Sequence, residues 1–335
     1  MTKTLAFVLM FILTTVLPSL CLAGPETAAP PIVGIAWRGD TDTPLFTSVC
    51  MAVEEAGGLW VLLDQVRSPD LSYDAHGKLL AGVDAYGILE PGSAKQIRCN
   101  SWHGSNAGEA VGDIGLVIFS GGEDISPSLY YSPQEWHGIL EEMDYNAERD
   151  VSDYLTMSYC LDHDIPVLGI CRGMQMLSVI SGAEFIQDIP AFLESHGLGA
   201  VNSHRDDSLR PDGPGSCISH DVEILRGSLL YRIYGTDVLK GCVSFHHQAI
   251  LNVDDTRLVV TGTADTQGLD MIEAIERTDK TCAIGLQFHP EIALIKHLDH
   301  EADEDEFMDY QTALRIFSWF LHEPVRPSTS LEPAA

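Results

Sequence analysis

The chain has 335 residues, of which 45% are hydrophobic, so it is long enough to bury a sizeable core. Its 49 acidic residues against 19 basic ones give a formal net charge of −30 at pH 7. A charge of this sign repels phosphate backbones and anionic lipid surfaces, which excludes nucleic acid and the membrane surface as expected partners.

The N-terminus has the three-part form of a secretory signal. Met1-Thr-Lys-Thr precedes an apolar run from Leu5 to Leu17, and the small-residue exit ends at Ala23. The run is too short to span a bilayer easily, so we expect residues 1–23 to be cleaved rather than to act as a membrane anchor. The mature protein would then be exported to a periplasm, to the medium or to an endomembrane lumen.

The expected mature chain keeps seven cysteines, which are Cys50, Cys99, Cys160, Cys171, Cys217, Cys242 and Cys282. An odd number suits one free catalytic thiol, and in an oxidising compartment the other six could form up to three disulfides. Cys50, Cys160 and Cys282 lie in apolar patterns and are alternatively small buried residues. No cysteine spacing resembles a zinc site, and neither a metal nor a cofactor is expected.

Short apolar strands alternate with helical patterns along the chain. Strands are expected at 32–37, 59–63, 114–119, 167–170, 222–225, 241–245, 258–263, 271–275 and 283–288, and helices at 47–56, 146–161, 171–181 and 307–321. The alternation predicts a three-layer α/β fold with a doubly wound, mostly parallel, flavodoxin-like sheet. We expect one domain over residues 31–322 and a disordered tail over 323–335.

A single cysteine stands where an expected strand turns into a helix. The run from Ile165 to Leu177 passes from an apolar segment through Cys171 into a helical pattern. At such a corner the side chain meets the first turn of the helix, where free N–H groups and the helix dipole favour a thiolate. Cys171 is therefore predicted to be a nucleophile.

A second expected strand ends in His289-Pro-Glu291. Residues two apart in an extended segment point the same way, so Glu291 could accept a hydrogen bond from His289 and fix its tautomer. Cys171, His289 and Glu291 would then supply a nucleophile, a base and an orienting acid. The alternative is a buried structural thiol with a surface histidine. We favour the site, because both motifs lie at strand ends, where parallel sheets bind ligands.

The two motifs together resemble those of class I glutamine amidotransferase-like proteins. Further segments resemble the gamma-glutamyl hydrolase branch, typified by gamma-glutamyl-gamma-aminobutyrate hydrolase; they are Phe119 to Tyr130, Glu148 to Asp150, Val243 to Gln248 and Glu273 to Glu276. The resemblance spans about residues 31–322. It implies that backbone N–H groups of Gly121, Gly122 and Arg172 stabilise the oxyanion.

The resemblance implies an exported cysteine hydrolase that cleaves gamma-glutamyl amide bonds of a small-molecule substrate through a thioester. The leaving group stays open, as does homo-oligomerisation. The alternatives are a glutaminase subunit, which would pass ammonia to a synthase, and a non-catalytic binding protein on the same fold. Export argues against the first alternative, and the intact set of Cys171, His289 and Glu291 argues against the second.

The substrate contacts are less strongly indicated. Gln175 follows the nucleophile by one helical turn, and His247 and Gln248 follow a strand at the same edge of the sheet. These three residues are assigned to substrate binding. Asp124 and Asp188 are expected to be capping or turn residues.

Residues 65–112 form an insertion, because the resembling enzymes have roughly half as many residues between the flanking elements. It is expected to leave its strand at the edge of the sheet that carries the site. Long segments of this kind are usually functional or disordered. The insertion is therefore either a lid or rim of the substrate pocket or a peripheral decoration.

Overall fold

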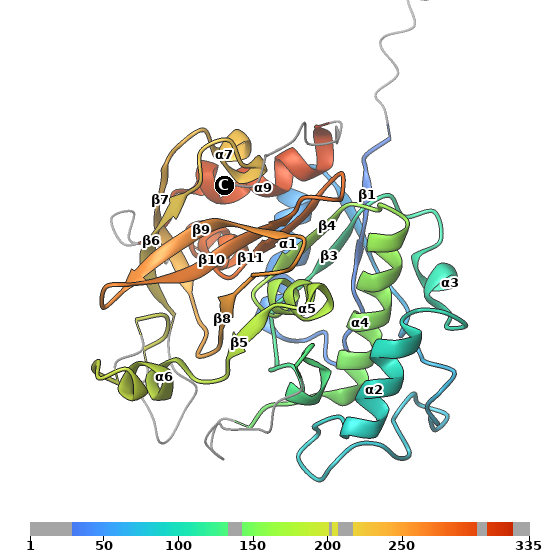
Figure 1. The fold of residues 1–335 in the computed structure, drawn as a ribbon. Helices are drawn as coiled ribbons and strands as arrows, with labels where there is room; N and C mark the ends of the chain where they lie inside the picture. The colour runs from blue at the N-terminus through green and yellow to red at the C-terminus, as the bar shows by residue number, and fades with distance from the viewer. Residues whose placement is uncertain (1–28, 133–142, 201–202, 207–216, 300–306, 324–335) are drawn as a thin grey trace, which may run out of the picture.

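The computed structural model describes residues 29–132, 143–200, 203–206, 217–299 and 307–323 (Figure 1). The expected signal segment and all of the expected tail except Glu323 lie outside these ranges. No helix within the described ranges combines the length and the apolar character that crossing a bilayer requires.

A nine-stranded sheet runs through the centre of the described structure, in the order β2-β1-β3-β4-β11-β10-β9-β6-β7. The first five strands are parallel, and they are β2 (Leu59–Leu62), β1 (Ile32–Ile35), β3 (Val117–Phe119), β4 (Val167–Ile170) and β11 (Ala283–Leu286). Their order is the 2-1-3-4-5 order of flavodoxin-like folds. The expected doubly wound α/β fold is confirmed.

Four antiparallel strands extend the sheet beyond β11. They are β10 (Leu269–Arg277), β9 (Leu258–Thr266), β6 (Ile218–Ile224) and β7 (Val238–Ser244). A separate two-stranded sheet pairs β5 (Glu184–Ile186) with β8 (Ala249–Asn252). β5 and β8 were not predicted, and the parallel strands are confined to one contiguous part of the large sheet.

Helices cover both faces of the parallel strands (Figure 1). On one face lie α1 (Pro44–Glu55), α8 (Pro290–Leu298) and α9 (Tyr310–His322), while α7 (Leu229–Tyr234) packs against α9 beside the antiparallel strands. On the other lie α4 (Ala147–Asp162) and α5 (Arg172–Ser181). Neighbouring strand residues point to opposite faces, so Ile118 and Leu168 join the first apolar cluster while Val117 and Val167 join the second.

The insertion at 65–112 is folded against the second face. Its helices α2 (Pro91–Asn100) and α3 (Ala107–Val111) lie outside α4, and α2 also contacts the short helix η1 (Pro127–Leu129) (Figure 1). Its buried residues Leu89 and Ile97 belong to the same apolar cluster as α4. Hydrogen bonds join the backbone of Leu89 to Ser126 and Ser128. The insertion is thus an integral part of one core.

Two successive loops in the insertion have the same sequence pattern and the same hydrogen bonds. The sequence Asp-Ala-x-Gly-x-Leu occurs at 74–79 and again at 84–89. Asp74 Oδ1 accepts hydrogen bonds from the second and fourth following N–H groups, at 2.8 and 2.9 Å, and Asp84 Oδ1 does the same at 2.8 and 3.0 Å. Each aspartate therefore closes a tight turn that aims the next leucine toward the core.

The cysteines are unpaired in the described residues, so the disulfides considered above are not formed. Cys50, Cys160 and Cys282 are buried, as the alternative interpretation required. Cys99 is exposed on α2, and Cys171 is buried at the start of α5.

The packing of the insertion predicts a clear loss of stability for Ile97→Ala. Ile97 is fully buried, so its truncation should lower the free energy of unfolding by about 2–4 kcal/mol through lost contacts and a cavity. Leu80 is 66% exposed, and Leu80→Ala should change the free energy of unfolding by less than about 0.5 kcal/mol. Urea unfolding followed by circular dichroism measures both. Equal stability of the two variants would contradict an integral insertion.

Candidate active site

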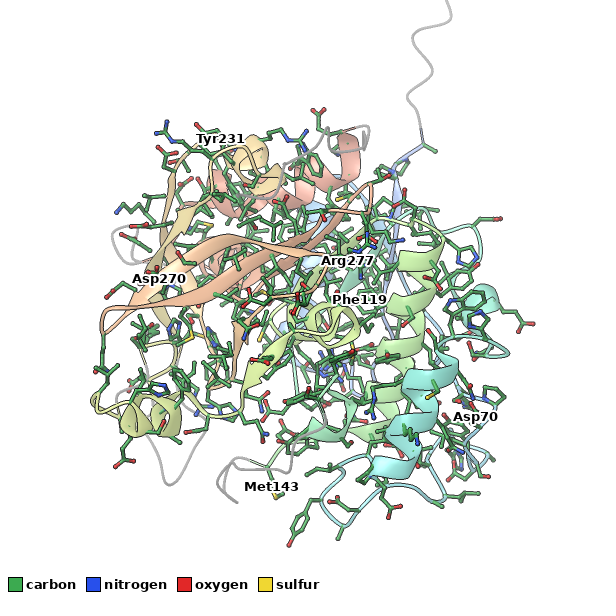
Figure 2. The ribbon with its side chains drawn as sticks, viewed as in Figure 1. Asp70, Phe119, Met143, Tyr231, Asp270 and Arg277 are labelled. Atoms are coloured by element: carbon green, nitrogen blue, oxygen red, sulfur yellow. The ribbon has the colours of Figure 1, made fainter. Side chains whose placement is uncertain are left out.

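Cys171 occupies a strained corner between β4 and α5. Its φ of 51° and ψ of −106° are uncommon for a residue with a side chain. Its N–H donates to Leu286 O at 2.6 Å, which ties the corner to β11. The helix start approaches β3 closely, since a Cβ on Gly173 would stand 2.2 Å from Phe119 O. Figure 2 shows Phe119 beside α5. The corner thus resembles a nucleophile elbow.

His289 and Glu291 lie at the end of β11 and the start of α8. His289 Nδ1 lies 2.7 Å from Glu291 Oε1, and both side chains are buried. His289 is the N-cap of α8 and Glu291 is in its first turn, so the two residues do not share one extended strand. The expected hydrogen bond is present, but the local geometry proposed for it was wrong. The contact places the shared proton on Nδ1 and leaves Nε2 for another partner.

The His289 ring lies beside the Cys171 thiol. A Cβ on Gly121 would stand 3.0 Å from His289 Cε1 and 3.5 Å from Cys171 Cβ, so both side chains flank this glycine. Burial lowers the pKa of His289, but the charges of Glu291 and Cys171 outweigh it and raise that pKa well above its ordinary value. These neighbouring charges therefore favour the protonated form of the ring.

Gln287 provides a contact that sequence reasoning missed. Its Nε2 donates to Cys171 Sγ at 3.5 Å, and its Oε1 accepts from Gln175 Nε2 at 3.4 Å. Gln175, assigned above to substrate binding, is buried and reaches the thiol through Gln287. A signal was available, because Gln287 lies two residues before His289 at the same strand end.

His247 lies between two carboxylates. Its Nε2 is 3.0 Å from Asp124 Oδ2, and its Nδ1 is 3.4 Å from Asp188 Oδ2. Asp188 also caps α6 (Ile189–Ser195) by accepting from Ala191 N, as expected of a capping residue. Gln248 is buried, so its side chain lines no open surface in this state. Asp124 and Asp188 are partly exposed whereas His247 is buried, and Asp124 lies in the loop that carries Gly121.

Two buried arginines fix the backbone around the thiol. Arg172 pairs with Asp150 at 2.6 Å and with Asp153. Burial raises the pKa of Asp150 to about 6, although Arg172 acts in the opposite direction. Arg149 pairs with Glu123, and its Nη2 donates to the carbonyl oxygen of Gly121 at 3.0 Å.

The bond from Arg149 orients the next peptide group. In a trans peptide the C=O of Gly121 and the N–H of Gly122 point in opposite directions. Because Arg149 holds the carbonyl, the Gly122 N–H is directed away from the arginine. Gly122 must be glycine here, because a Cβ would stand 2.0 Å from Arg149 Nη1. The loop is thus fixed in one peptide orientation.

The chain is similar to several known proteins. The chain is 31% identical to Protein NtpR of Enterococcus hirae over 59% of its own length and 74% of that protein. It is 26% identical to gamma-glutamyl-gamma-aminobutyrate hydrolase of Escherichia coli O157:H7, over 53% of this chain and 63% of that enzyme. Among solved structures, a glutamine amidotransferase from Thermotoga maritima aligns with a TM-score of 0.42 and 17% identity, covering 87% of this chain and 94% of that one.

These sequence relatives indicate a cysteine hydrolase of the amidotransferase-like class. The sequence profile of the Peptidase C26 family matches residues 97–291, which is more than half of the chain. The protein belongs to the Peptidase C26 family, and the resemblance seen in the sequence motifs is confirmed.

Removing the buried ion pairs should lower the free energy of unfolding far more than removing an exposed ion pair. Arg172→Met leaves Asp150 without its cation and leaves Asp153 with only Arg149 Nε at 3.5 Å, so it should lower the free energy of unfolding by about 3–5 kcal/mol. Arg226→Met removes the exposed ion pair with Asp237 and should leave the free energy of unfolding almost unchanged. Urea unfolding tests both variants. Similar losses would show that the buried network has no special role in stability.

Proposed function

We propose that the protein is a self-contained hydrolase of gamma-glutamyl amide bonds, with Cys171 as nucleophile. The observation that carries this proposal is the placement of the thiol on a strained strand-to-helix corner beside the His289 ring, whose Nδ1 lies 2.7 Å from Glu291 Oε1. Such an arrangement supplies an activated nucleophile and a proton donor at one point.

The reaction begins with attack of the Cys171 thiolate on the carbonyl carbon of the gamma-amide. Negative charge moves to the carbonyl oxygen, and the N–H groups of Gly122 and Arg172 are the proposed donors that stabilise it. His289 gives its Nε2 proton to the leaving amine as the C–N bond breaks, which leaves a thioester. Water then attacks the thioester while His289 Nε2 takes its proton, and glutamate departs as the thiolate is restored.

The gamma-glutamyl preference is supported by the relative from Escherichia coli, whose name gives that substrate class. The negative charge near the site also supports the gamma-glutamyl preference. A gamma-glutamyl group carries a free α-ammonium, and Asp124 and Asp188 offer partly exposed carboxylates around His247. We propose that this cluster binds the ammonium while the scissile amide lies over Cys171. Export remains a prediction from the sequence.

Replacing the nucleophile should abolish turnover without unfolding the protein. Cys171→Ala should lower kcat by at least about a thousandfold, because it removes the group that forms the thioester. Cys99→Ala changes an exposed thiol and should leave kcat unchanged. Glutamate release by the purified protein alone is measured on gamma-glutamyl-gamma-aminobutyrate, other gamma-glutamyl amides and glutamine. Glutamate release by wild-type protein only when a synthase partner is present would favour the glutaminase alternative.

Glu291→Gln should shift the pH profile as well as lower the rate. The amide still accepts a hydrogen bond from His289, but the charge that raises the pKa of this histidine is lost. The proton needed by the leaving amine should therefore be lost at a lower pH, and the alkaline limb of the kcat/KM profile should move to lower pH. An unshifted limb in an active variant would mean that the charge of Glu291 does not act on His289.

A further inference from the structure

Three histidines and a glutamate meet away from the thiol. His204, His220, His246 and Glu273 each offer one ligand atom, and these atoms lie within 4.8 Å of one another. His220 lies on β6, His246 follows β7 and Glu273 lies on β10, while His204 lies in the described segment 203–206. No cysteine takes part, which is why cysteine spacing gave no sign of this cluster.

Four of the six separations among these atoms are close to those of a tetrahedral metal site. Glu273 Oε1 is 3.1 Å from His204 Nδ1, 3.4 Å from His246 Nε2 and 3.8 Å from His220 Nε2. His204 Nδ1 is 3.2 Å from His220 Nε2. Zinc bonds of about 2.0–2.1 Å at tetrahedral angles place ligand atoms about 3.3–3.4 Å apart. These four separations bracket this value, and all six lie within 4.8 Å, so the side chains would have to move closer together for one ion to contact all four atoms.

The other nitrogen of each ring meets an oxygen. His246 Nδ1 is 2.8 Å from Gln248 O, and His220 Nδ1 is 3.3 Å from Asp221 O. A carbonyl can only accept, so these contacts place a proton on Nδ1 and direct Nε2 of both rings toward Glu273. His204 Nε2 is 2.6 Å from Thr266 Oγ1. Outer contacts of this kind orient histidines that bind metals.

Glu273 is aimed into the cluster by an irregularity of its strand. Ile272 pairs with Thr263 and Ala274 pairs with Gly262, so Glu273 is the additional residue of a β-bulge. Bulges redirect side chains and are frequent at functional sites. Glu273 is fully buried, and its carboxylate lies among the rings of His204, His220 and His246. A buried carboxylate is costly unless positive charge, from a protonated imidazole or a bound metal ion, lies beside it.

We propose that His204, His220, His246 and Glu273 bind one Zn²⁺ in a closed, structural site. Imidazole nitrogens with one carboxylate oxygen suit zinc, and four protein ligands leave no open position for a reacting water. The ion would join β6, β10, the segment after β7 and the segment 203–206. Glu273 O also accepts from Gln287 N at 2.8 Å, and the side chain of Gln287 touches Cys171. A zinc ion bound there would therefore stabilise the strand end whose Gln287 contacts the candidate nucleophile.

Zinc content of the purified full-length or naturally processed protein tests this proposal independently of activity. Elemental analysis should find about one zinc per chain, and His220→Ala and Glu273→Gln should each lower this to less than about a tenth. His76→Ala, which removes an exposed histidine of the insertion, should keep the full content. Retention of zinc by both cluster variants would overturn the proposal.

A second measurement uses wild-type protein and so tests the proposal even if the variants fail to fold. Wild-type protein stripped with a chelator should lose thermal stability and regain it on addition of Zn²⁺ but not of Mg²⁺. Replacement by Co²⁺ should give the visible absorption typical of tetrahedral cobalt. A wild-type protein that contains no zinc, and whose Tm does not change when Zn²⁺ is added, would show that the cluster binds protons only.

Discussion

The buried pairing of Arg172 with Asp150 and Asp153 is the interaction on which the candidate site depends most. It joins the start of α5 to α4, directly behind the residue that holds the thiol. The corner at Cys171 is strained, and strain of this kind persists only where the surroundings enforce it. A fixed guanidinium with two carboxylates does so, because moving the helix start would separate charges that water cannot reach.

Arg149 extends the same network to the opposite side of the site. It reaches from α4 to the loop at Gly121 and Gly122, so one helix positions both the nucleophile corner and the proposed oxyanion donors. Preorganisation of this sort lets charge develop in the transition state without rearrangement of the protein. The segment 148–150, which resembles the gamma-glutamyl hydrolase branch, thus has a structural role at the site. Glu148 also accepts from Leu79 N and links the insertion to α4.

The local motifs were readable from the sequence because each lies within a few adjacent residues. Cys171 and the His289 to Glu291 pair lie in compact patterns at strand ends, and the parallel strands follow from continuous apolar runs. The helix α8 was missed although Pro290 at its first turn is a recognised start signal, and α2 begins with Pro91 in the same way. These two helices were within reach of sequence reasoning.

Other features could not be read locally, because they depend on contacts between distant segments. The His204, His220, His246 and Glu273 cluster draws on four segments and on a β-bulge, which no periodicity reveals. The second glutamate of the same sequence motif, Glu276, accepts from the first N–H groups of α7. Glu273 and Glu276 thus belong to one short motif but have different surroundings, and only the tertiary structure distinguishes their roles.

The shared core of α4 and the insertion has a consequence for local unfolding. Segments that share one apolar cluster tend to open together, so the helices α2 and α3 should belong to the same cooperative unit as α4. Opening that unit would also release the peptide groups that Arg149 holds beside Cys171. A segment that lies on the outside of the molecule is in this way coupled to the order of the residues around the thiol.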